Sequence, residues 1–145
     1  MLQDILQAGK DSAALLERLR LLPPEELGEE RAAALLQAAI ERKLMLGTCG
    51  EDGIRNLIIR SVKQSGLAGQ GLSQEEVQRQ IEKYDCHQTS LVAKKKVLLF
   101  FFIEDRLGIR LDDEEAAGIQ SVPQLAACIV RRMREVRAAQ RRENL

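Results

Sequence analysis

The feature that most constrains the fold is the run "VLLFFFI" at residues 97–103, where seven consecutive side chains are apolar. A surface helix carries a single apolar stripe, so a helix that is apolar on every side is expected to be covered on every side. A run of this length could also form a buried strand. The flanking segments, "AKKK" before it and "EDRLG" after it, continue a helix better than they bound a strand. We therefore predict a helix that ends at Gly108.

The remainder of the chain also favours an all-α fold. Of its 145 residues only three are Phe, one is Tyr and none is Trp, while Ala, Leu, Arg, Glu and Gln are abundant. This length suits one domain, or a small domain with an extension.

Residues 1–47 are predicted to form a helical hairpin. Leucines recur at helical spacing over residues 2–22, and Gly9 suggests a break into two pieces, the second capped by Asp11 or Ser12. Pro23 and Pro24 end this helix. A second helix is expected from Pro24 or Glu29 to Leu46.

Residues 48–136 are predicted to form a four-helix bundle, separated from the hairpin by the glycine-rich segment "GTCGEDG" (47–53). We expect an amphipathic helix over about 52–64, and "SQEEV" (73–77) has the form of a capping box for a short helix reaching Tyr84. After the apolar helix, "DDEEAAG" begins another short helix, and Ser121 caps the last one. Residues 137–145 form a basic C-terminal tail.

The order and spacing of these elements resemble the acyl carrier protein family over roughly residues 50–135. The similarity is strongest in "VLLFFFIEDRLGIRLDDEEAAGIQSVPQLAACI" (97–129). The residues that match the family pattern, or nearly match it, are Val97, Leu99, Ile103, Glu104, Leu107, Gly108, Ile109, Leu111, Asp113, Glu114, Ala116, Ile119, Ser121, Val122 and Ile129.

In a working carrier a serine at the start of the long helix holds a 4'-phosphopantetheine arm. The family register places that position at Ala93, which has no oxygen to modify. Ser90 lies three residues earlier and is followed by Leu91, so it is the candidate attachment site if the chain carries an arm at all. Its alternative role is that of a helix N-cap.

The resemblance also implies a docking face on the long helix, where carriers usually present acidic residues to basic enzymes. Here the matching positions hold Lys94, Lys95, Lys96, Leu98 and Phe101. Like charges oppose each other across an interface, so the usual carrier enzymes should not bind this face. Lysines at a helix start also oppose the helix dipole, which favours a role in binding a partner.

Only one side of the apolar helix can face a small bundle. We expect Val97, Leu99, Phe100 and Ile103 to point inward. Leu98, Phe101 and Phe102 would then form an exposed apolar patch, which soluble monomers rarely keep without a use. The hairpin, a second copy of the chain or a partner protein should cover it.

Other residues that could carry chemistry have simpler explanations. The four carboxylates from Asp112 to Glu115 suit the positive end of a short helix. Cys49, Cys86 and Cys128 contain no CxxC pair, which argues against a disulfide framework or a zinc site, and adjacent Cys86 and His87 seldom give catalytic geometry. The six arginines of residues 131–142 fit a helix end, although they could contact nucleic acid.

The sequence shows no signal peptide and no membrane span, so a cytoplasmic protein is expected. The function expected from the resemblance is that of a non-catalytic acyl-carrier-like binding or adaptor subunit, without a cofactor. Its partner would be a protein or enzyme of a biosynthetic or peptide-maturation system, and a homo-oligomer is compatible with the sequence. Two alternatives remain: a true carrier modified with phosphopantetheine at Ser90, and a helical module that binds protein or, less in keeping with its zero net charge, nucleic acid.

Overall fold

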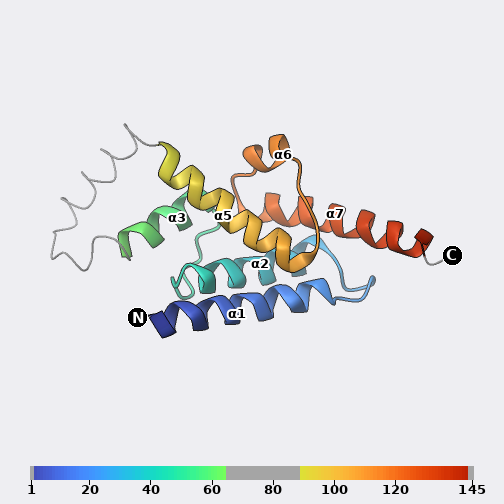
Figure 1. The fold of residues 1–145 in the computed structure, drawn as a ribbon, viewed down its shortest axis with the longest axis horizontal. Helices are drawn as coiled ribbons and strands as arrows, with labels where there is room; N and C mark the ends of the chain where they lie inside the picture. Colours follow the sequence, from blue (N-terminus) through green and yellow to red (C-terminus); the bar gives the residue numbers. More distant parts are fainter. Residues whose placement is uncertain (1, 65–88, 144–145) are drawn as a thin grey trace.

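The computed structural model describes residues 2–64 and 89–143, and every regular element within them is a helix (Figure 1). The all-α class is therefore confirmed. The helices are α1 (Leu2–Arg20), α2 (Glu29–Lys43), α3 (Ile54–Val62), α5 (Thr89–Leu107), α6 (Asp113–Gly118) and α7 (Val122–Glu143). The short helix expected over 73–84 and the pair Cys86 and His87 lie outside the described residues.

Helices α1 and α2 form the hairpin that the sequence predicts, but the predicted break in α1 is wrong. The helix passes through Gly9 without interruption, because one glycine costs a helix only about 1 kcal/mol relative to alanine. Ser12 is not a cap. It is buried, and its hydroxyl donates a 2.7 Å hydrogen bond to the carbonyl oxygen of Ala39, which ties α1 to α2.

Helix α2 ends three residues before the predicted Leu46. Met45 adopts the left-handed conformation with φ 59°. The Met45 N–H donates to the carbonyl of Arg42, and the Leu46 N–H donates to that of Glu41. This is the Schellman pattern of a helix C-terminus. Helix α5 ends in the same way, with Gly108 at φ 68° and the Ile109 N–H donating to Glu104, so the predicted end at Gly108 is confirmed.

The hairpin and the other helices share a single hydrophobic core. Helix α1 packs against α2 and α5, α2 packs against α7, and α3 packs against α5. The core combines Leu16 and Leu36 of the hairpin with Leu57, Ile103 and Ile129. In Figure 1 the hairpin lies along one side of α5 and α7.

The segments before α3 and α7 hold each other in place. The Ile54 N–H donates to the carbonyl of Gln120, and the Val122 N–H donates to that of Asp52, each at 2.8–2.9 Å. Ser121 caps α7 as predicted, since its hydroxyl accepts a hydrogen bond from the Gln124 N–H at 3.3 Å. These contacts hold the start of α3 beside the start of α7.

Candidate partner-binding face

The apolar run lies in the middle of α5, and its helical nature is confirmed. Leu99, Phe100, Ile103 and Leu107 are buried in the core. Val97, which we expected to point inward, is 48% exposed. The expectation failed because Val97 precedes Leu99 by two residues, about 200° around a helix.

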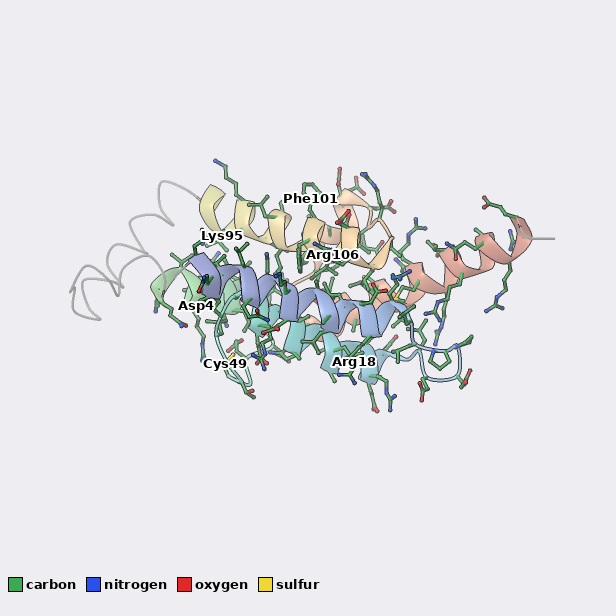
Figure 2. The ribbon with its side chains drawn as sticks, turned by 60° about the horizontal axis from the view of Figure 1, so that its bottom comes forward. Asp4, Arg18, Cys49, Lys95, Phe101 and Arg106 are labelled. Atoms are coloured by element: carbon green, nitrogen blue, oxygen red, sulfur yellow. The ribbon has the colours of Figure 1, made fainter. Side chains whose placement is uncertain are left out.

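The opposite side of α5 carries an exposed strip, which we call the outer face: Lys94, Val97, Leu98, Phe101 and Asp105. Leu98 is 65% exposed and Phe101 57%, and both are large apolar side chains. Lys94, Leu98, Phe101 and Asp105 recur at spacings of three and four, so they follow one line along the helix. Figure 2 shows α5 with Lys95, Phe101 and Arg106 labelled. The apolar centre of the outer face is thus flanked by a cation at one end and an anion at the other.

The hairpin covers only part of the predicted patch. Phe102 is half-buried against the core, and the ammonium of Lys43, at the end of α2, lies 4.3 Å from the centre of its ring. The Arg106 guanidinium lies 5.6 Å from the same ring, and such cations are attracted to the aromatic face. Of the three covers expected from the sequence, the hairpin does not cover Leu98 and Phe101, since both remain exposed; a second copy or a partner protein stays a prediction.

The three lysines do not share one face. Lys94 is exposed and belongs to the outer face, whereas Lys95 is half-buried. The Lys96 amine lies 3.4 Å from the carbonyl oxygen of Ala117 in α6, and partial burial lowers its pKa. Because α5 begins at Thr89, all three lie beyond its first turn, where the dipole effect is small. The helix dipole therefore gives no reason to assign these lysines a role in binding a partner.

A hollow of about 830 Å³ borders the outer face at the C-terminal end of α5. Phe101, Glu104 and Asp105 line one side, and Arg110, Arg132 and Val136 line the other. The Arg132 guanidinium is already engaged, since it donates to the carbonyl of Arg110 and to the carboxylate of Glu135. Partial burial raises the pKa of Glu104, and the nearby Asp113 adds to the effect. This end therefore offers carboxylates beside an exposed phenylalanine.

Ala93 occupies the position at which a carrier would hold its phosphopantetheine arm, and its side chain has no hydroxyl. Ala93 is exposed and borders a hollow of about 480 Å³, together with Ile54 and Arg55 of α3 and with Lys96, Ile119 and Gln120. Ser90 lies in the first turn of α5. The structure thus places Ser90 near the start of the helix on which Lys94, Leu98 and Phe101 lie.

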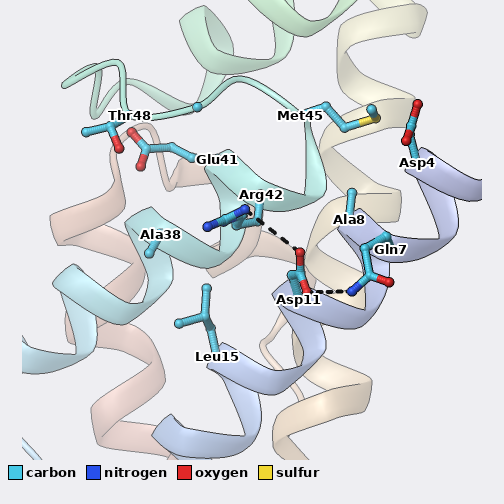
Figure 3. Close-up of a pocket in the computed structure, with 11 residues that line it drawn as sticks. Asp4, Gln7, Ala8, Asp11, Leu15, Ala38, Glu41, Arg42, Met45 and Thr48 are labelled. Atoms are coloured by element: carbon cyan, nitrogen blue, oxygen red, sulfur yellow. Dashed lines mark hydrogen bonds and ion pairs between the residues drawn. The ribbon is translucent and has the colours of Figure 1, made fainter. Parts of the chain in front are cut away.

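A third hollow, of about 660 Å³, lies between α1, α2 and the loop that follows (Figure 3). Four of the polar side chains around it are already paired. The Gln7 amide donates to Asp11 at 2.9 Å, and Asp11 forms an ion pair with Arg42 at 3.8 Å. Glu41 accepts hydrogen bonds from Gln37 and from the N–H of Cys49, each at 3.1 Å. We assign these groups to holding the hairpin and its loop together.

The remaining residues of interest from the sequence are structural. Glu115, one of the four carboxylates at the start of α6, pairs with Arg131 of α7. The basic C-terminal segment continues α7 to Glu143, and Arg134 and Arg137 donate to the carbonyls of Leu27 and Arg20. Within the described ranges, no group of three or more His, Cys, Asp or Glu residues could hold a metal ion. None of the described helices is both long and apolar enough to cross a membrane.

The chain matches no protein-family model, and no curated protein or solved structure is significantly similar to it. The resemblance to acyl carriers therefore rests on the residues of this chain alone.

Proposed function

We propose that this chain is a non-catalytic, acyl-carrier-like protein that binds a protein partner through the outer face of α5 and carries no phosphopantetheine. The observation that carries the proposal is the exposure of Leu98 and Phe101 on a helix that buries Leu99, Phe100, Ile103 and Leu107 in the core. Large apolar side chains that are exposed close together on a surface are typical of interaction sites. On the resemblance, the chain is a binding or adaptor subunit of a biosynthetic or peptide-maturation system.

Two further features support the carrier-like part of the proposal, and a third supports the absence of an arm. Helices α3, α5, α6 and α7 occur in the order and relative lengths that the resemblance implies, with α6 short. Gly108 ends α5 and Asp113 begins α6, as the matched residues require. The matched attachment position holds Ala93, which cannot form the phosphoester bond to an arm.

A second candidate function is that of a true carrier modified at Ser90. It is favoured by one observation: Ser90 is the second residue of α5, close to the helix start where carriers hold their serine. The segment differs from the carrier pattern in having Thr89 where an aspartate precedes the serine.

Intact mass spectrometry separates the two functions. The full chain is incubated with coenzyme A and a promiscuous phosphopantetheinyl transferase, alongside a known carrier protein that reports enzyme activity. We expect no gain in mass for this chain. A gain of one phosphopantetheine that is lost in Ser90→Ala would identify a carrier and refute the first proposal.

A further inference from the structure

The charges and apolar residues of the outer face are arranged symmetrically about one point of α5. Leu98 and Phe101 lie on either side of the midpoint between Leu99 and Phe100, and Lys94 and Asp105 lie equally far from it on the same line. With a rise of about 1.5 Å per residue, the two charges are about 16 Å apart along the helix axis. A copy of this helix turned end to end would therefore meet it with opposite charges aligned.

We propose that the outer face of α5 pairs with the same face of a second copy of this chain, the two helices running antiparallel. A two-fold interface uses one surface twice, so each residue must be complementary to its counterpart in the other copy. In this pairing Lys94 faces Asp105 at both ends, and Leu98 packs against Phe101 across the axis. The inference rests on the proposed function, because it names the partner that occupies the proposed docking face.

The surroundings of the outer face are compatible with this pairing. Lys94, Leu98, Phe101 and Asp105 are all exposed, so the strip is open along its length. The hollow beside Phe101 is bordered by the carboxylates of Glu104 and Asp105, which would receive the Lys94 ammonium of the other copy. Two cations, Arg110 and Arg132, also border the hollow. The Arg132 guanidinium is bonded to the carbonyl of Arg110 and to Glu135.

A second copy explains the outer face better than an unrelated partner does. When a surface binds a different protein, the charges that complement it lie on that protein, and the surface need not carry them itself. The outer face instead contains its own complement, with a cation and an anion at equal distances from an apolar centre. Complementary charges at such positions set the register and orientation of an interface.

Charge reversal tests the pairing on the full-length protein. Wild type, Lys94→Glu, Asp105→Lys and the double variant are compared by sedimentation equilibrium from about 1 μM to about 1 mM, a range that covers weak dimers. Both substitutions are at exposed positions, and circular dichroism verifies that each variant remains folded. We expect wild type to dimerise and each single variant to dissociate at least about tenfold more readily, because like charges then face each other.

Two further samples make the test specific to the antiparallel arrangement. The double variant restores opposite charges and should dimerise as wild type does. An equimolar mixture of the two single variants should form heterodimers, since the glutamate introduced at position 94 of one chain would face the lysine introduced at position 105 of the other. A monomeric wild type, single variants that dimerise normally, or a mixture that stays monomeric would each overturn the pairing. Sedimentation does not report whether the chain carries a phosphopantetheine arm. The mass measurement tests that part of the proposed function separately, so the two proposals can fail independently.

Discussion

At the level of single residues, Phe101 and Phe102 have different surroundings although they are neighbours in the sequence. One step along a helix rotates the side chain by about 100°, which takes Phe102 to the side of α5 that the hairpin covers. There the centre of its ring lies 4.3 Å from the Lys43 ammonium and 5.6 Å from the Arg106 guanidinium. Phe101 remains 57% exposed. The chemistry of the two residues is the same, so only their position on the helix distinguishes the packed ring of Phe102 from the exposed ring of Phe101.

Cys128 gives a prediction at the same scale. Partial burial raises the pKa of its thiol to about 11, and Glu115 adds to the shift by hydrogen bonding and by its charge. The reactive form is the thiolate, whose fraction at pH 8 falls about 100-fold when the pKa rises by about two units. Greater nucleophilicity of a more basic thiolate offsets part of this loss. We expect Cys128 to react with iodoacetamide at least about tenfold more slowly in the folded chain than in urea-unfolded chain.

Peptide mass spectrometry measures this rate at Cys128 separately from the other two cysteines. Glu115→Gln removes the carboxylate beside the thiol and should increase the rate in the folded protein. Equal rates for folded and unfolded protein would show that Cys128 has an ordinary thiol pKa.

At the level of the helix, α5 should tolerate changes on its outer face and not on its inner face. Leu98→Ala removes a side chain that is 65% exposed, and we expect the free energy of unfolding to change by less than about 0.5 kcal/mol. Leu99→Ala removes one that is only 4% exposed, and it should lower that free energy by about 2–5 kcal/mol. Urea unfolding at a low protein concentration, where self-association contributes little, measures both. Equal losses would mean that Leu98 belongs to the core.

The sequence predicted the helices more reliably than the contacts between them. The apolar run, Gly108 and Ser121 located α5 and the start of α7 correctly, because these signals act within one turn of the chain. The break at Gly9 was wrong because packing against α2 outweighs the small cost of one glycine. The bond from Ser12 to Ala39 and the position of Lys43 over Phe102 join residues far apart in the sequence, and no local pattern encodes such contacts. For the candidate site, Leu98 and Phe101 could be predicted to be exposed, whereas the separate location of Lys96 could not.

At the level of the whole molecule, the hairpin completes the core instead of covering the outer face. Leu16, Leu19, Leu36 and Ile40 of the hairpin are fully buried with residues of α3, α5 and α7. The guanidiniums of Arg134 and Arg137 in α7 reach back to carbonyls at both ends of the loop that joins α1 to α2. The protein therefore leaves the outer face of α5 open while its interior is complete. An exposed apolar strip on a protein whose core is otherwise complete is typical of an interaction site.

The central claim, that the chain associates through the outer face of α5, is tested most directly by removing that face's apolar centre. Leu98→Ser/Phe101→Ser is compared by sedimentation equilibrium with Ile5→Ser/Leu6→Ser, which removes two apolar side chains of α1 that are 55% and 57% exposed. We predict that the α5 variant stays folded and becomes monomeric, while the α1 variant associates as wild type does. Association that survives in the α5 variant, or that is lost equally in both, would contradict the account.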